Sequence, residues 1–255
     1  MRFIISVINL NFMTKVLLIG GGGLIGRKVA IYLKKLEYSI VIADIIVPHE
    51  ADKIKGADYV KLDIGSHNSI ASTLLKVTDN ISCIINLAYP KGSGYGNDLM
   101  NVTLEEFNAN ISLHLGGYFN VMKVAADYFL KKGIKGQVIS ISSIYGVILP
   151  KFELYDGLNM TSPVEYTCIK HSIVALSKYF AKYFLKNGIC FNTVSYGGVF
   201  DSQHPKFVAR YSAHSGQIGM LSSEEHLGIS LKYLIEAQGQ GVTGQNLIVD
   251  DGFTL

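Results

Sequence analysis

The stretch Lys15-Val-Leu-Leu-Ile-Gly-Gly-Gly-Gly-Leu-Ile-Gly26 joins a short apolar run to a cluster of glycines. Apolar residues then recur at helical spacing over residues 24–36, and a second apolar run, residues 39–43, ends at Asp44. This order predicts a strand, a glycine turn, a helix and a second strand. Together these elements form the βαβ unit of a parallel sheet, and the fold is expected to extend outward from it.

The alternation of strands and helices continues to the C-terminus. Further strands are predicted at residues 59–62, 81–86, 137–142, 189–195 and 246–249, with helices at about 67–77, 103–131, 164–186 and 222–237. Two helix starts carry capping signals, Thr103-Leu-Glu-Glu106 and Ser222-Ser-Glu-Glu225. The pattern predicts one α/β domain, a doubly wound Rossmann-type domain in which helices cover both faces of a mostly parallel seven-stranded sheet. Ligands of such sheets bind beyond the carboxyl ends of the strands.

Composition excludes several classes of protein. The chain has 255 residues, 49% of them hydrophobic and 17% charged, and its net charge is only +3. It contains neither a run of about 20 apolar residues nor a basic cluster, so we expect no membrane span and no nucleic-acid partner. Cys83, Cys168 and Cys190 lie in apolar runs, which is typical of reduced core cysteines in a cytoplasmic protein and indicates no metal site.

Residues 1–13 stand apart from this pattern. Their apolar run resembles part of a signal sequence, but Asn9 and Asn11 interrupt it and no small-residue cleavage site follows. We expect either a loosely held N-terminal extension or a true translation start at Met13. The Rossmann-type domain is therefore assigned to residues 14–255.

The glycine cluster matches two phosphate-binding patterns. Gly20, Gly23 and Gly26 fit G-x-x-G-x-x-G, whereas Gly21, Gly23 and Gly26 fit G-x-G-x-x-G. Glycine allows positive φ and a close approach of the backbone. The helix that follows, beginning at Leu24-Ile25, offers free N–H groups to a pyrophosphate. The setting between a strand and a helix favours dinucleotide binding over a mere turn.

Asp44 stands eighteen residues past Gly26, at the end of the second predicted strand. A carboxylate there can accept both hydroxyls of an adenosine ribose and would repel a 2′-phosphate. The sequence therefore predicts NAD in preference to NADP. The alternative is that Asp44 is a solvated loop acid.

Tyr166 and Lys170 are four residues apart on a predicted helix, so their side chains project from one face. Ser162, Pro163 and Glu165 predict its start, with Ser162 as the N-cap. A lysine ammonium beside a phenol favours the phenolate, and lowering a tyrosine pKa from near 10 to about 7 needs roughly 4 kcal/mol. The pair is a candidate general acid/base, and the alternative is an ordinary amphipathic surface.

The glycine loop, Asn86-Leu-Ala88, Ser142-Ser-Ile-Tyr-Gly146 and Tyr166-x-x-x-Lys170 occur in the order found in short-chain dehydrogenases/reductases, and residues 15–255 resemble that family. The resemblance implies that Tyr166 is the catalytic acid/base. It implies that Lys170 lowers the Tyr166 pKa and holds the nicotinamide ribose. Ser143 would orient the substrate oxygen, while Ser142 points elsewhere.

The same resemblance implies further cofactor contacts. Asp63 and Ile64 match the pair that contacts adenine, and Asn86 with Ala88 matches the turn over the cofactor. Val199, beyond the sixth strand, is assigned to the cofactor as well.

The chain departs from the family pattern beside the substrate. His114 stands where the family has an asparagine that holds a water near the lysine, and its ordinary pKa would suit a proton relay. The alternative is a packed helix-face histidine. The family's Asn-Ala-Gly turn is here Ala88-Tyr89-Pro90, and Asp201 replaces a usual threonine.

Two segments are expected near the substrate. Residues 150–156 belong to an insertion between Ser143 and Tyr166, and residues 92–101 look like a flexible flap. Four cations are candidates for holding an anionic substrate: Lys91, Lys151, Lys206 and Arg210. For any one of them a solvated surface position is the alternative.

Within the family, Ser162 to Tyr166 and Val249 to Phe253 resemble the flagellin modification protein A subgroup. We therefore expect an NAD-dependent oxidoreductase that interconverts an alcohol and a ketone on a polar, sugar-derived substrate. A sugar phosphate, amino sugar or nucleotide sugar in surface-glycan or nonulosonic-acid biosynthesis would fit. The alternatives are a non-catalytic NAD-binding regulator and a reductase of a lipid or steroid ketone. The resemblance also implies that apolar helices such as those beginning at Thr103 and before Tyr166 pack between subunits, so we expect a homodimer or homotetramer.

Overall fold

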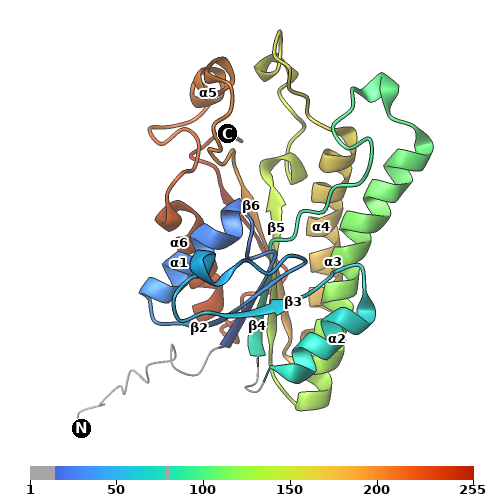
Figure 1. Cartoon of the computed structure of the whole chain (residues 1–255), viewed down its shortest axis with the longest axis vertical. Helices are drawn as coiled ribbons and strands as arrows, with labels where there is room; N and C mark the ends of the chain where they lie inside the picture. Colours follow the sequence, from blue (N-terminus) through green and yellow to red (C-terminus); the bar gives the residue numbers. More distant parts are fainter. Residues whose placement is uncertain (1–14, 78–80) are drawn as a thin grey trace.

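A parallel seven-stranded sheet forms the centre of the computed structural model, which describes residues 15–77 and 81–255 (Figure 1). The strands are β1 (Lys15–Ile19), β2 (Ser39–Asp44), β3 (Asp58–Lys61), β4 (Ile81–Asn86), β5 (Gln137–Ser143), β6 (Cys190–Tyr196) and β7 (Asn246–Val249). Their order is β3-β2-β1-β4-β5-β6-β7, and every pair is parallel. The predicted doubly wound fold is confirmed. The extension predicted at residues 1–13 lies outside the described residues.

Helices cover both faces of this sheet (Figure 1). On one face lie α1 (Leu24–Lys35) and α6 (Glu224–Glu236), and on the other lie α2 (His67–Lys76), α3 (Leu104–Lys132) and α4 (Val164–Tyr183). In β1 the residues alternate between the two cores. Leu17 belongs to the core with α3 and α4, and Leu18 to the core with α1 and α6. Burial on both faces explains why the strands are continuously apolar.

Two helix starts follow capping signals. At α3 the capping box is present as predicted, because Glu106 N donates to Thr103 Oγ1 and Thr103 N donates to Glu106 Oε2. At α6 the predicted cap is off by one residue. Ser223 is the N-cap and His226 occupies the third helical position, where a glutamate was expected.

At α4 the helix begins at Val164, as predicted, but the predicted N-cap is wrong by one residue. Pro163 takes the extended N-cap conformation itself, so the helix begins at Val164 and Ser162 lies outside it. The Ser162 hydroxyl makes no cap hydrogen bond. Glu165 does not reach back to close a capping box; its side chain is fully buried, and neither carboxylate oxygen has a hydrogen-bond partner.

A short helix that the sequence analysis missed, α5 (Pro205–Ser212), lies beyond the carboxyl end of the sheet (Figure 1). His204 caps it by accepting from Lys206 N, and Phe207 and Tyr211 bury its apolar side. This helix stands beside the ends of β5 and β6, where ligands of such sheets bind. In the part of the chain that the structure describes, no helix is long and apolar enough to cross a bilayer.

Candidate active site

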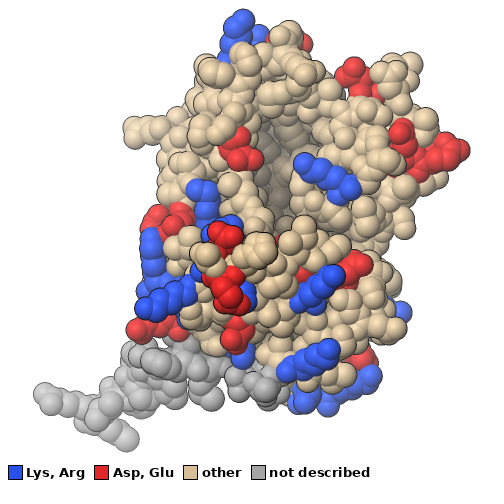
Figure 2. Space-filling model, viewed as in Figure 1, with Lys and Arg blue, Asp and Glu red and all other residues tan. Residues whose placement is uncertain are grey.

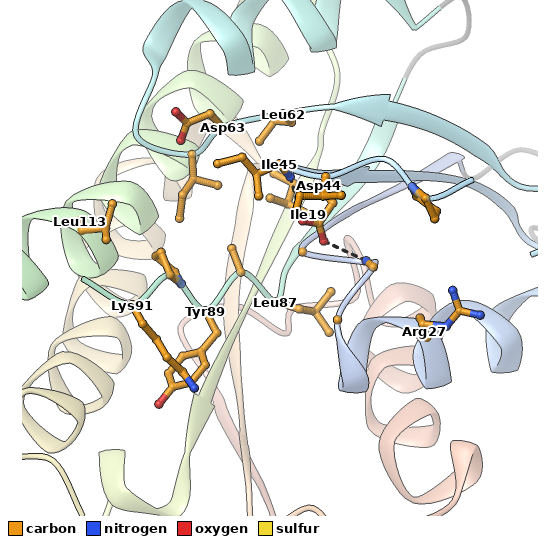
Figure 3. Close-up of a pocket in the computed structure, with 18 residues that line it drawn as sticks. Ile19, Arg27, Asp44, Ile45, Leu62, Asp63, Leu87, Tyr89, Lys91 and Leu113 are labelled. Carbon is orange, nitrogen blue, oxygen red and sulfur yellow. Dashed lines mark hydrogen bonds between the residues drawn. The ribbon is translucent and has the colours of Figure 1, made fainter. Parts of the chain in front are cut away.

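Two adjoining cavities open at the carboxyl ends of the strands. The first, of about 630 Å³, lies over the glycine loop, Asp44 and the loop after β4 (Figure 3). The second, of about 310 Å³, lies at the ends of β5 and β6 and is bounded by α5. Figure 2 shows a hollow in the upper half of this face, with most of the visible charged side chains away from it. The strand order changes direction between β1 and β4, so the first cavity, over the ends of these strands, sits at the switch point of the sheet.

The glycine loop has no room for a side chain at Gly20, Gly21 and Gly26. Gly20 has φ +75°, and a Cβ there would lie 2.6 Å from the backbone nitrogen of Ala88. A Cβ on Gly26 would collide with Gly20 O. Gly21 is packed against Ile42, whereas Gly23 has nothing nearer than 3.5 Å to an added Cβ. The loop therefore forms a close-fitting cradle whose open side, at Gly23, leads into the N-terminus of α1, as a pyrophosphate site requires.

Asp44 lies against this loop at the end of β2. Gly22 N donates to Asp44 Oδ2 at 3.0 Å (Figure 3), and Ile45 N donates to Oδ1 at 2.8 Å. The carboxylate is thus fixed at the edge of the first cavity, with lone pairs left for ribose hydroxyls. Arg27 lines the same cavity, and its guanidinium donates to Asp52 O. The sequence analysis did not single out Arg27, although its place one residue after Gly26 put it at the loop.

The other predicted cofactor residues divide between the two cavities. Asp63, Ile64 and Ala88 line the first cavity. Asn86 is buried beneath it, where Oδ1 accepts from Ala88 N and Nδ2 has no partner. Val199 lines the second cavity instead of the first. The unpaired Asn86 amide and the glycine cradle fit a dinucleotide in the first cavity.

Two of the predicted catalytic residues, Ser143 and Tyr166, meet at the second cavity. Ser143 is the last residue of β5, and its hydroxyl accepts from Tyr145 N at 3.1 Å and hydrogen-bonds with Tyr166. Ser142 points elsewhere, as predicted, because its hydroxyl donates to the backbone carbonyl of Lys170 at 2.8 Å. The end of a core strand and the first turns of α4 therefore bring Ser143 and Tyr166 together.

Lys170 lies one turn further along α4 and is only 4% exposed. Its Nζ donates to Ile141 O at 3.1 Å. Burial lowers the pKa of Lys170 to about 7, because the ammonium loses its water. The pKa of Lys170 therefore lies close to neutral pH, where both the ammonium and the neutral amine are populated.

Tyr166 differs from the expectation of a lowered pKa. Its pKa is raised, first because the phenol is buried and then because of the neighbouring Tyr89; the hydrogen bond with Ser143 opposes both effects. The sequence showed the lysine beside the phenol but not the aromatic surroundings that exclude water from both. Near neutral pH these surroundings keep Tyr166 as a phenol.

His114 lies beside Lys170, but without the ordinary pKa that the sequence suggested. It is 1% exposed, and both ring nitrogens lack a hydrogen-bond partner. Burial and the charge of Lys170 lower its pKa to about 2. The ring packs against Tyr89 and Tyr118, with centroids 5.3 and 5.4 Å away. A relay through His114 would therefore use the neutral imidazole.

The two segments expected near the substrate are tied down. Asn110 Oδ1 accepts from Gly92 N at 2.8 Å, and Asn110 Nδ2 donates to Ser93 O at 3.2 Å, which anchors the segment 92–101 to α3. The insertion is held from α5, where Arg210 Nη1 donates to Leu154 O at 3.2 Å and Asp156 O at 2.7 Å. Arg210 therefore supports the cavity wall.

None of the four predicted cations lines the second cavity. Lys91 lines the first cavity, Lys151 packs on the Phe253 ring, and Arg210 is engaged with backbone carbonyls. Among the described residues, those lining the second cavity carry no charged side chain. Many of them carry an aromatic ring, a hydroxyl group or both: Tyr89, Tyr145, Tyr155, Tyr166, Tyr211 and Ser162. The lining of the second cavity therefore gives no support to the prediction that these cations hold an anionic substrate.

Comparison with known proteins adds independent findings. A family model described as enoyl-(acyl carrier protein) reductase matches residues 23–254. The chain is 34% identical over 200 residues, 77% of each protein, to the post-translational flagellin modification protein A of Campylobacter coli. It is 26% identical over 256 residues, 94% of this chain and 96% of the other, to a 2,5-dichloro-2,5-cyclohexadiene-1,4-diol dehydrogenase of Sphingobium indicum.

One solved structure is similar over the full length of the chain. It is a short chain dehydrogenase from Leptospira borgpetersenii with bound NAD+, with 27% identity and a TM-score of 0.86, covering 100% of this chain and 98% of the other. The parallel seven-stranded sheet and its helices thus agree with this likeness.

Proposed function

Because the chain belongs to the short-chain dehydrogenase/reductase family of NAD(P)-dependent oxidoreductases, we propose that it interconverts an alcohol and a ketone on a polar, sugar-derived ring, with NAD as its cofactor. One observation carries the proposal. Ser143 and Tyr166 present their hydroxyls to the second cavity, directly beside the cleft that fits a dinucleotide.

The preference for NAD is argued from Asp44. The glycine cradle would hold the pyrophosphate, and Asp44 would accept the ribose hydroxyls while its negative charge opposes a 2′-phosphate. The bound cofactor would supply the acceptor for the hydride of the alcohol carbon. Arg27 at the same cleft donates to Asp52 O, whereas the Asp44 carboxylate bonds directly to the loop through Gly22 N.

The protein groups divide the proton chemistry among them. Ser143 would fix the substrate oxygen by hydrogen bonding. Tyr166, whose raised pKa keeps it as a phenol, stands ready to donate a proton to a ketone oxygen, and in the reverse direction it takes the alcohol proton. The Lys170 ammonium beside it would stabilise the phenolate that donation leaves behind. General acid/base help of this kind is typically worth about 10²–10⁴ in rate.

The substrate class is argued from the second cavity. Aromatic faces suit the apolar face of a sugar ring, and the hydroxyls of Tyr145, Tyr155 and Ser162 suit its polar edge. Its uncharged lining favours an uncharged ring at the catalytic end, with any phosphate or nucleotide portion outside. The name of the Campylobacter relative supports a role in surface-glycan synthesis, and that of the Sphingobium relative supports a cyclic diol.

A second candidate is a reductase of a lipid or steroid ketone. The many rings and the absence of charge in the second cavity favour it. A third, a non-catalytic NAD-binding regulator, is opposed by the intact cluster of Ser143, Tyr166 and Lys170.

The deciding experiment follows NADH formation and consumption with a panel of candidate substrates. The panel contains free sugars, N-acetylated amino sugars, sugar phosphates, nucleotide sugars and a steroid ketone. Tyr166→Phe should lose activity by about 10²–10⁴-fold and keep its affinity for NADH. Tyr233→Phe, an exposed tyrosine on α6, is the matched control. Wild-type turnover by Tyr166→Phe would disprove the mechanism, and NADH binding without turnover of any panel member would favour the regulator.

We also propose a homodimer or homotetramer. A groove between α3 and α4 exposes Phe119 and Tyr179, 46% and 67% exposed, and a second copy of the chain is the partner that family resemblance favours. Light scattering of wild type and of Tyr179→Glu tests this, and a monomeric wild type would contradict it.

The three cysteines are unpaired, which supports a reducing compartment such as the cytoplasm.

A further inference from the structure

Tyr89 stands on the boundary between the two cavities and lines both. It lies in the loop after β4, and in Figure 3 it projects from that loop together with Lys91. Its ring stands edge-on to the ring of Tyr166, with centroids 5.7 Å apart. A large aromatic side chain is thus placed beside the reacting groups, where both cofactor and substrate would pass.

Lys170, behind this ring, has few polar partners for a buried cation. Its Nζ donates to Ile141 O, and none of the ion pairs among residues 15–77 and 81–255 involves it. Three aromatic rings surround it instead. Nζ lies 5.5 Å from the ring centroid of Tyr89, 5.8 Å from that of Tyr118 and 5.5 Å from that of Tyr166. Each distance is within the ~6 Å at which an aromatic face attracts a cation.

We propose that Tyr89 is a positioning residue that completes an aromatic cage around the Lys170 ammonium and keeps that charge beside Tyr166. The proposal rests on the proposed function only in assigning Lys170 to the reaction, because the cage is a property of the protein alone. Tyr118 is fixed by hydrogen bonds from its hydroxyl to the carbonyls of Asn86, Ala88 and Ile141. Tyr89 is therefore the member of the cage that can be altered without removing the acid/base or a buried anchor.

The position of Tyr89 is itself held by a contact across the pocket. Its hydroxyl hydrogen-bonds with that of Tyr95, which belongs to the segment 92–101. Asn110, buried in α3, holds that segment by accepting a hydrogen bond from Gly92 N and donating one to Ser93 O. The ring is therefore fixed from the loop after β4 at one end and from the segment at the other.

The other charged and titratable groups around the cage come from three elements. From α3, His114 faces Lys170 and is kept neutral by burial. From α4, the buried Glu165 acts on Tyr89 and Tyr95 and raises the pKa of both, although burial is the larger cause for each. From the loop after β4, Lys91 lies 5.0 Å from the Tyr89 ring centroid. Strand β5 contributes the Ile141 carbonyl and the Ser143 hydroxyl, neither of which carries charge.

This arrangement predicts the direction in which Lys170 titrates when the ring changes. Burial favours the neutral amine and lowers the pKa of Lys170, while the aromatic faces favour the ammonium. A variant that loses the attraction of the Tyr89 ring but still excludes water should therefore lower the pKa of Lys170 further. A variant that admits water to Lys170 should raise that pKa instead. The direction of the pKa change thus distinguishes loss of the ring's attraction from entry of water.

The test is a titration of isotope-labelled lysine side chains by NMR on the full chain, with the Lys170 signal assigned from Lys170→Arg. Tyr89→Phe keeps the ring and loses the hydroxyl contact with Tyr95. Tyr89→Leu keeps an apolar side chain and loses the ring. Tyr89→pentafluorophenylalanine keeps the shape and inverts the charge distribution of the ring, so it serves even if Tyr89→Leu fails to fold.

We expect Tyr89→Phe to titrate as wild type. We expect the Lys170 pKa to fall by on the order of half a unit to one unit in the leucine and pentafluorophenylalanine variants. An unchanged or raised pKa in the pentafluorophenylalanine variant overturns the cage. An equal fall in Tyr89→Phe overturns it too, because the hydroxyl contact would then be responsible. The titration needs no substrate, so a chain that oxidises no alcohol but titrates as expected would refute the proposed function and leave the cage intact.

Discussion

The Ser142 hydroxyl donates to the backbone carbonyl of Lys170 at 2.8 Å, and both residues are buried. This bond joins the end of β5 to the second turn of α4. Those two elements carry Ser143 and Tyr166, so the distance between their hydroxyls depends on a neighbour whose own hydroxyl is engaged with the backbone.

Ser142→Ala should therefore destabilise the protein and misplace the catalytic groups. Loss of this hydrogen bond should cost about 0.5–1.5 kcal/mol, because the Lys170 carbonyl lies inside α4 and keeps its helical N–H donor. Urea unfolding would measure the difference. Ser140→Ala on the same strand is the matched control, because its buried hydroxyl has no hydrogen-bond partner. Equal effects of the two substitutions on unfolding and on turnover would show that the bond to Lys170 does not matter.

The glycine loop should separate folding from cofactor binding. Gly26→Ala places a Cβ against Gly20 O and should cost stability as well as NAD affinity. Gly23→Ala meets nothing closer than 3.5 Å and should fold normally, yet weaken NAD binding by at least about tenfold, since its Cβ would occupy the face where a pyrophosphate approaches. Thermal melting and calorimetric titration with NAD distinguish the two. Unimpaired NAD binding by Gly23→Ala would place the pyrophosphate elsewhere.

Asp44→Asn should weaken the discrimination between NAD and NADP. The amide keeps an acceptor for Gly22 N but removes the negative charge that opposes a 2′-phosphate. Two unit charges at 4 Å interact by about 1–4 kcal/mol in surroundings between water and a protein surface, so the ratio of affinities should shift at least about fivefold toward NADP. Asp63→Asn, another acid lining the same cavity, is the control. Equal shifts in both variants would show that Asp44 does not determine the preference for NAD over NADP.

His114 should make the fold sensitive to acid. Its pKa is lowered to about 2 in the folded chain, against 6.5 for an ordinary histidine, so the unfolded chain binds the extra proton first. The stability associated with neutral His114 is fully present above pH 6.5 and is lost as the pH falls toward 2, at up to about 1.4 kcal/mol per pH unit.

His114→Asn should flatten this loss of unfolding free energy between pH 6.5 and pH 4, as measured by urea unfolding at several pH values. His67→Asn, an exposed residue at the start of α2, controls for the loss of a histidine. If His114→Asn loses stability on acidification as steeply as wild type, another group is responsible.

Sequence alone was sufficient where structure is local. The run before Gly20, the cradle and the capping box at Thr103 depend on neighbours within a few residues, and each was found where predicted. The N-cap of α4 was predicted wrongly although it is a local feature. Pro163 occupies the N-cap position that had been assigned to Ser162. The eight-residue α5 was missed because so short an amphipathic segment gives little periodicity.

What could not be predicted arises from contacts between distant segments. The burial that lowers the pKa of His114 is produced by rings from the loop after β4 and from α3 together. Arg210 bonds to carbonyls 54 and 56 residues earlier in the chain, so a residue that looked like a ligand for an anion proved to be a support. In the sequence, Tyr89 stood out only as a departure from the family's turn. Its position between the two cavities depends on the shapes of those cavities, which the sequence does not show.

The support from Arg210 ends on carbonyl oxygens of residues 154 and 156, and every amino acid has such an oxygen. This support is therefore insensitive to the side chains at residues 154 and 156, while buried Leu154 holds the insertion by packing as well. Tyr155, which lies between them, lines the second cavity, so mutation there can alter what the pocket accepts while the Arg210 contacts remain. A chain built in this way is well placed to diverge toward new substrates in single steps.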